Sequence, residues 1–151
     1  MTLSSKTEGL IMKDNITLEV VWRDTGFFQA TVFCASENVS VKNNIYITDD
    51  GLDDLVNGIQ LFLSEKKPEF FWESCDRGDK SSASVSFCFM RKDGRGHILI
   101  EVYLELDDGG KHSRHNCCFF VNTELGLLEQ FREKLIALKQ LPLGAKVSLN
   151  P

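Results

Sequence analysis

The densest group of side chains that could hold a metal or attack a substrate is His112, His115, Cys117 and Cys118. Imidazole nitrogens and thiolates are zinc ligands, and a histidine beside a cysteine can generate a nucleophilic thiolate. We expect a strand here, which places His115 and Cys117 on one face and Cys118 on the other, so the four groups do not converge. The pattern predicts no metal site, no catalytic residue and no cofactor. We therefore expect a protein that is not an enzyme, with an enzyme pairing one of these histidines with a cysteine as an alternative.

A second group of reactive side chains lies along the clearest strand pattern of the chain, Ile98 to Leu106, and comprises Glu101, Tyr103, Glu105 and Asp107. Strand side chains alternate, so these four share the face opposite the aliphatic residues. Glu101 and Glu105 are separated by roughly 13 Å along a strand, too far to flank one scissile bond. Carboxylates on one face need water or a partner. We predict that this face binds another protein.

Four further carboxylates, Asp49, Asp50, Asp53 and Asp54, open an amphipathic helix predicted for residues 49–67. Backbone N–H groups at a helix N-terminus favour carboxylates, and we expect the first two to cap the helix. The spacing lacks the alternating ligands and closing glutamate of a calcium-binding loop. We predict that this acidic group forms part of the partner-binding surface.

Composition limits the choice of partner. The 151 residues carry a net charge of −5, which argues against direct binding of nucleic acid and favours a basic partner. Five cysteines at irregular spacings, without an apolar leader at Met1 to Ser5, predict reduced thiols in the cytoplasm. Nothing approaches a membrane-spanning apolar run. We expect a monomer or weak homodimer.

Period-two patterns predict strands around a single change to helical period. Ile16, Leu18, Val20 and Trp22 alternate with Thr17, Glu19 and Arg23, which places Trp22 on the core side of the first strand. A hairpin at 24–26 leads to strands over 27–35 and 39–47, and the helical stripe Leu52 to Leu63 follows. Strands resume at 69–74, 85–89, 98–106 and 114–121. Asn122 or Thr123 is the expected cap of a last helix, with an apolar stripe at Leu128, Phe131, Leu135 and Leu138.

This order predicts a single α+β domain over 1–151, with an antiparallel sheet of about seven to eight strands and two helices packed on one side. Phe70, Phe71 and Trp72 are consecutive in a strand, so at least one is expected to face solvent. If that strand lies at an edge, it offers another binding surface by strand addition.

The order of elements resembles that of small bacterial immunity proteins of the Wap type, and of related families found beside polymorphic and contact-dependent growth inhibition toxins. The resemblance covers about Asn15 to Pro142. It rests on Ile47-Thr48-Asp49 before the first helix, Pro68-Glu69-Phe70-Phe71 after it, the aliphatic strand Ile98 to Leu106 ending in acids, and Phe119-Phe120-Val121 before the last helix.

What the resemblance implies is a protein that neutralises one cognate toxin domain in the cytoplasm of the cell that makes both, by blocking its active site or a nearby surface. Such toxins often attack nucleic acids and are basic at their active sites, which suits an acidic partner. The alternative function is a small-molecule-binding or regulatory module with a pocket between sheet and helices.

Overall fold

The computed structural model describes residues 14–75, 83–106 and 115–151. In chain order the elements are β1 (Asn15–Asp24), β2 (Phe27–Ala35), β3 (Ser40–Thr48), α2 (Asp49–Leu63), β4 (Glu69–Glu73), β5 (Ser84–Arg91), β6 (His97–Leu106), β7 (His115–Glu124), α3 (Leu125–Ala137), the 3-10 helix η1 (Leu138–Gln140) and β8 (Lys146–Ser148).

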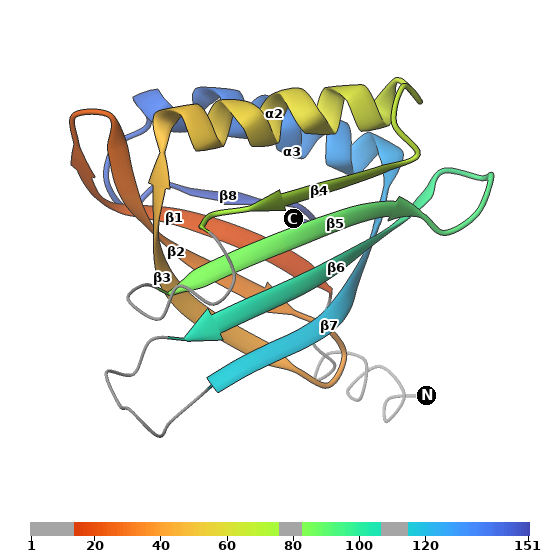
Figure 1. Cartoon of the computed structure of the whole chain (residues 1–151), viewed down its shortest axis with the longest axis horizontal. Helices are drawn as coiled ribbons and strands as arrows, with labels where there is room; N and C mark the ends of the chain where they lie inside the picture. The colour runs from red at the N-terminus through yellow and green to blue at the C-terminus, as the bar shows by residue number, and fades with distance from the viewer. Residues whose placement is uncertain (1–13, 76–82, 107–114) are drawn as a thin grey trace, which may run out of the picture.

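The strands form two four-stranded sheets, with the order β3-β2-β1-β8 in sheet A and β4-β5-β6-β7 in sheet B. Neighbouring strands are antiparallel throughout. Figure 1 shows the two sheets one behind the other, with both helices lying across one end of the pair. The predicted α+β class and its eight antiparallel strands are confirmed within the described residues, and the structure adds that they divide equally between two sheets.

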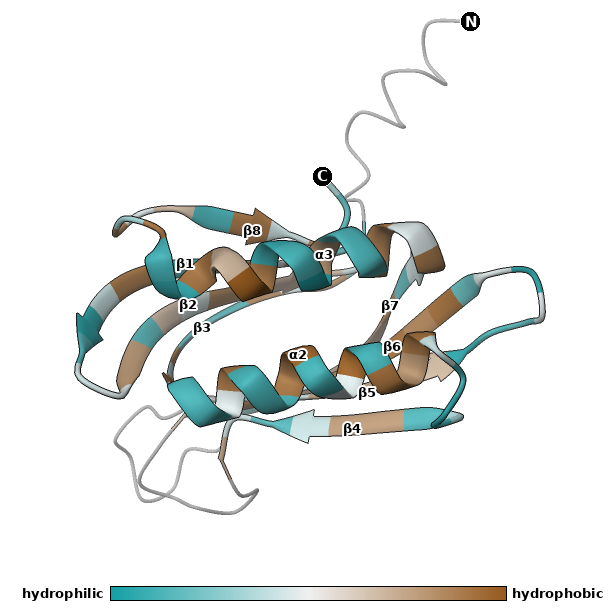
Figure 2. Cartoon of the chain, turned by 90° about the horizontal axis from the view of Figure 1, so that it is seen from above, coloured by the Kyte–Doolittle hydropathy of each residue, from teal (hydrophilic) through white to brown (hydrophobic). Residues whose placement is uncertain are grey.

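The helices complete the core between the sheets. Seen from above in Figure 2, α2 runs beside β4 and α3 lies on the side of β8, and the two helices contact each other. One continuous cluster of buried side chains joins both sheets and both helices, including Leu18, Val32, Ile100, Phe62 and Phe131. The face of each strand that was predicted to be apolar therefore points inward, with one exception in β1.

That exception is a β-bulge. The pairing of β1 with β2 shifts register between Val20 and Trp22, so Trp22 lies opposite Gln29 and Arg23 opposite Phe28. Trp22 is 42% exposed, and the prediction that it faces the core is wrong. Arg23 takes the inner side instead, where its guanidinium donates to the carbonyls of Leu138 and Leu141. One extra residue in a strand reverses the facing of everything after it, and the period-two pattern does not signal this.

The helix caps also differ from the predictions. Thr48 caps α2, and its Oγ1 accepts a hydrogen bond of 2.9 Å from the N–H of Gly51, so Asp49 and Asp50 occupy the first turn. The helix ends at Leu63, before the lysines predicted to close it. In α3 the cap is Glu124, without a side-chain hydrogen bond, because β7 extends through Asn122 and Thr123.

Candidate functional site

The outer face of sheet B is where the predicted acidic strand lies. Register places Phe71, Cys88, Glu101 and Phe120 side by side on four adjacent strands. The next row on the same side of the sheet is Glu73, Ser86, Tyr103 and Cys118, of which Ser86 is buried, and the row on the other side is Glu69, Met90, Leu99 and Asn122. We call these three rows, together with Glu105, the sheet B face.

Two aromatic residues flank the acid at the centre of this face. Phe71 is 51% exposed and Phe120 is 45% exposed, while Glu101 between them is half-buried. The prediction that one residue of the Phe70 to Trp72 segment faces solvent is confirmed, since Phe70 and Trp72 pack on the core side. The three rows contain three glutamates, Glu105 is the fourth glutamate of the face, and no lysine or arginine belongs to it, although Lys92 donates to Asn122 at its edge. The face is thus both apolar and negatively charged.

The negative charge of this face affects the pKa of the Cys88 thiol. Burial raises the pKa of Cys88, and the carboxylates of Glu69 and Glu101 raise it further. The thiol is therefore kept protonated and is a poor nucleophile. Cys88 lies between Phe71 and Glu101 in the pairing register, within the sheet B face.

The structure brings together some of the predicted binding residues and separates others. Glu101, Tyr103 and Glu105 lie half-buried on the sheet B face, whereas Asp107 is outside the described residues. The acids of α2 point in more than one direction. Asp53 accepts a hydrogen bond of 2.7 Å from Lys139 of η1, and this bond, together with the charges of Asp53, Asp49 and Asp50, raises the pKa of Lys139.

Asp54 lies on the side of α2 that faces sheet B, as does Asp50 one turn before it. Asp54 precedes Gly58 by one helical turn, and Gly58 packs against the Phe70 ring of β4. Asp49 and Asp53 are likewise one turn apart, on the side of the helix where Lys139 binds. The acidic group of α2 and the sheet B face are therefore not one continuous carboxylate surface.

Sequence reasoning missed several members of the face. Glu69, Glu73 and Phe120 were not selected, because their position beside Glu101 depends on how β4 and β7 pair with the central strands. The alternation in each strand shows which residues share a side, but no local pattern shows which strands are neighbours. One sequence feature does indicate an outward aromatic residue in β7: Phe119 and Phe120 are consecutive in a strand, so one of them must face outward.

Three of the four residues considered as zinc ligands, His115, Cys117 and Cys118, lie on β7. His115 and Cys118 are exposed at β7, and Cys117 is half-buried on the opposite side from Cys118. His112 is outside the described residues. Over the described ranges, no group of three or more histidine, cysteine or acidic side chains is arranged to hold a metal ion.

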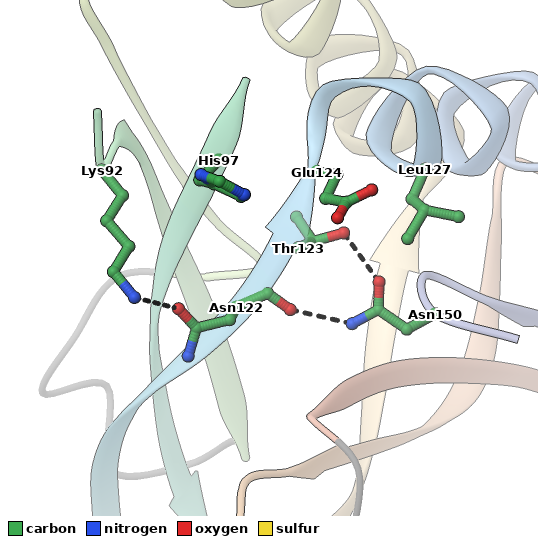
Figure 3. Close-up of a pocket in the computed structure, with 7 residues that line it drawn as sticks. All are labelled: Lys92, His97, Asn122, Thr123, Glu124, Leu127 and Asn150. Atoms are coloured by element: carbon green, nitrogen blue, oxygen red, sulfur yellow. Dashed lines mark hydrogen bonds between the residues drawn. The ribbon is translucent and has the colours of Figure 1, made fainter. Parts of the chain in front are cut away.

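A small-molecule site between sheet and helices was the alternative, and that space is filled by core side chains. The structure does contain an open hollow of about 430 Å³ at the ends of β6 and β7, lined by Lys92, His97, Asn122, Thr123, Glu124, Leu127 and Asn150 (Figure 3). Its polar groups bond to one another: Lys92 Nζ donates to Asn122 Oδ1 over 3.1 Å, and Thr123 Oγ1 donates to Asn150 Oδ1 over 2.7 Å. These hydrogen bonds hold β7 to the segments beside it, so the polar groups of the hollow are already engaged within the protein.

Comparisons with known proteins do not assign this chain to a family. The sequence matches no protein-family model, and neither the curated proteins nor the solved structures contain a significant match to it. Among the helices that the structure describes, none is both long enough and apolar enough to cross a membrane.

Proposed function

We propose that this protein is an immunity protein, which binds a cognate bacterial toxin domain in the cytoplasm of the producing cell and blocks it by covering its surface. The observation that carries the proposal is the sheet B face, where exposed Phe71 and Phe120 flank Glu101 among further glutamates. The resemblance in the order of elements supports the same function. The toxin that fits this face is basic, as toxins that cleave nucleic acids are.

Each part of the face has a separate role in such a complex. The glutamates attract a positively charged partner over a distance set by ionic strength and so increase the association rate. The two phenylalanines provide apolar area at the centre of the contact, where water is excluded and dissociation is slowed. The protein needs no chemical step to inhibit the toxin, because occupying its substrate-binding surface is sufficient.

The test pairs this protein with the product of the toxin gene adjacent to its own. In the double variant Glu101→Lys/Glu105→Lys, the association rate constant measured by stopped-flow fluorescence falls about tenfold or more, because electrostatic steering is reversed. The urea midpoint stays near that of the unchanged protein, since both side chains lie on the outer side of the sheet and are only partly buried. Growth rescue during toxin expression is weakened in parallel.

The matched control is Glu129→Lys/Glu133→Lys on the exposed side of α3, which changes the net charge equally and has the same separation in the sequence. It leaves association within about twofold of the original rate, because those acids lie away from the proposed contact. Equal slowing in both double variants would assign the effect to net charge. Full association by the Glu101/Glu105 variant would exclude the sheet B face.

A further inference from the structure

Three aromatic rings lie in contact on the outer face of sheet A, on the opposite side of the molecule from the sheet B face. Trp22, Phe27 and Tyr46 come from β1, β2 and β3, and their ring centroids are 5.4, 6.3 and 6.0 Å apart. Trp22 is 42% exposed and Tyr46 is 56% exposed. We call these three residues the aromatic cluster. Such large rings are normally covered, so their grouping at the surface indicates an interaction site.

The β-bulge in β1 is what exposes the cluster. Without the register shift after Val20, Trp22 would face the core and Arg23 would face solvent. With the shift, Trp22 aligns with Gln29 and Tyr46 in one outward-facing row. Arg23 turns inward and is held by two carbonyl groups, with its guanidinium 5.8 Å from the centre of the Phe28 ring. The local fold thus removes a cation from this surface and places an indole there.

Carboxylates border the cluster. Asp24 and Thr48 lie on either side of Phe27 in the next outward-facing row, and Asp49 follows Thr48 directly. Asp49 is held beside the hairpin, because its N–H donates to the Gly26 carbonyl over 2.9 Å. Asp24 is exposed, and neither of the two rows that contain the rings carries a lysine or arginine, although the charge of Lys139 in η1 interacts with that of Asp49. The surroundings of the cluster therefore favour a cationic partner.

We infer that the aromatic cluster, with Asp24 and Asp49, is a second docking surface, which binds an arginine-bearing segment of a protein partner. Because the rings touch one another, no space between them can enclose a compact ammonium group. A cation must lie on the exposed ring faces, and the flat guanidinium of arginine stacks there while it pairs with the neighbouring carboxylates. This surface is independent of the sheet B face, so both can be occupied at once.

The chain offers a local readout, because it contains two tryptophans and they lie in different environments. Trp22 belongs to the cluster, whereas Trp72 is 5% exposed and its Nε1 donates to the Gly51 carbonyl over 2.9 Å. Fluorotryptophan labelling gives one ¹⁹F resonance for each. Titration with a hexa-arginine peptide shifts the Trp22 resonance in a saturable manner and leaves the Trp72 resonance in place. A hexa-lysine peptide of equal charge binds about two- to fivefold more weakly.

Variants separate the cluster from general charge attraction. Tyr46→Ser removes a ring that is mostly in solvent, so the fold is retained, and it weakens the hexa-arginine response of Trp22 about two- to fivefold. Phe120→Ser, on the sheet B face, is the matched control and leaves that response unchanged.

Four outcomes would overturn the inference. The first is a Trp22 resonance that does not move, and the second is an equal response to both peptides that Tyr46→Ser does not alter. The third is a shift that depends on protein concentration alone, with a dimer in sedimentation, which would assign the cluster to a second copy of the chain. The fourth is a shift with phosphatidylglycerol vesicles in place of the peptide.

Discussion

Cys34 shows how strongly the interior of this protein disfavours charge. The side chain lies on the inner side of β2 and is fully buried. Burial is the main reason that the pKa of its thiol is raised far above the ordinary range, and the nearby thiol of Cys117 adds to the effect. In the folded protein Cys34 stays protonated under conditions in which an exposed cysteine ionises. It is a small apolar residue of the core, with no role as a nucleophile.

The thiol pKa of Cys34 is higher in the folded protein than in the unfolded chain, and this difference predicts a loss of stability at alkaline pH. Below the thiol pKa of the unfolded chain, Cys34 is protonated in both states and its contribution to stability is complete. Above that pKa the unfolded chain releases a proton that the folded protein keeps, so the free energy of unfolding falls by about 1.4 kcal/mol for each pH unit. Urea unfolding between about pH 7.5 and 10 measures how the free energy of unfolding changes with pH. In Cys34→Ala this slope corresponds to the release of about one proton fewer on unfolding.

The two proteins are compared by the pH dependence of their free energy of unfolding and not by its absolute value. Cys34→Ala also lowers stability at every pH, because it leaves a small cavity. Cys117→Ala keeps most of the slope, since burial of Cys34 is the larger cause of its raised pKa. An unchanged slope in Cys34→Ala would show that this thiol is not the group responsible.

At the scale of elements, the close approach of α2 to β4 positions one edge of the sheet B face. A Cβ added at Gly58 would lie 1.9 Å from Cζ of Phe70, so only a glycine allows the helix to rest on that ring. Phe70 in turn stacks on Phe89, with 5.5 Å between ring centroids. This contact orients β4, and with it Phe71 on the opposite side of the strand.

Two glycine substitutions in helices are therefore expected to have opposite effects. Gly58→Ala destabilises the protein by about 1–3 kcal/mol, because the methyl group forces Phe70 and β4 to move. Gly126→Ala in α3 meets no atom within 4 Å and stabilises the protein by up to about 1 kcal/mol through helix propensity. Equilibrium urea denaturation measures both changes.

A second mutation in the same contact provides a check. Replacing Phe70 by leucine in the Gly58→Ala background recovers part of the lost stability, because the smaller side chain leaves room for the methyl group. If Gly58→Ala were as stable as Gly126→Ala, the proposed close packing of α2 on β4 would be incorrect.

At the scale of the whole molecule, two asparagines connect the sheets at opposite edges. Asn43 of β3 is 6% exposed, and its Nδ2 donates to the carbonyls of Ser84 and Glu105 in sheet B over 3.4 and 3.1 Å. Asn150, after β8, donates to the carbonyls of Asp14 and Asn122 over 2.8 and 2.9 Å. The bonds of Asn43 and the bond from Asn150 to Asn122 cross between sheets that share no strand, whereas the bond to Asp14 stays within the region of sheet A. The crossing bonds therefore tie the two sheets together.

Asn43→Ala is expected to lower the free energy of unfolding by about 1–3 kcal/mol, since it leaves buried carbonyls without a donor. Asn44→Ala is the control on the next residue of the same strand, which points outward and bonds to Thr31 over 2.7 Å. It costs at most about 1 kcal/mol, because water replaces an exposed bond. Urea denaturation with a tryptophan fluorescence readout compares them, and equal losses would contradict a special role for the sheet junction.

The local features of this protein were predictable from the amino-acid sequence alone. Strict alternation located the aliphatic strand and the outward side of Glu101, Tyr103 and Glu105, and the stripe from Leu52 to Leu63 located α2. These features were predictable because a strand or helix repeats over a few residues and its buried side follows from that repeat. The α+β class followed from the order of the two kinds of repeat.

The identity of the distant residues that become neighbours follows from the three-dimensional fold. The fold divided the strands between two sheets and placed Phe71 and Phe120 beside Glu101. It also turned Asp53 toward Lys139, and a single bulge exchanged the sides of Trp22 and Arg23. Strand partners, register shifts and the direction of a helix face depend on contacts between segments far apart in the chain, and local periodicity carries no information about them. Both candidate binding surfaces arise from such contacts.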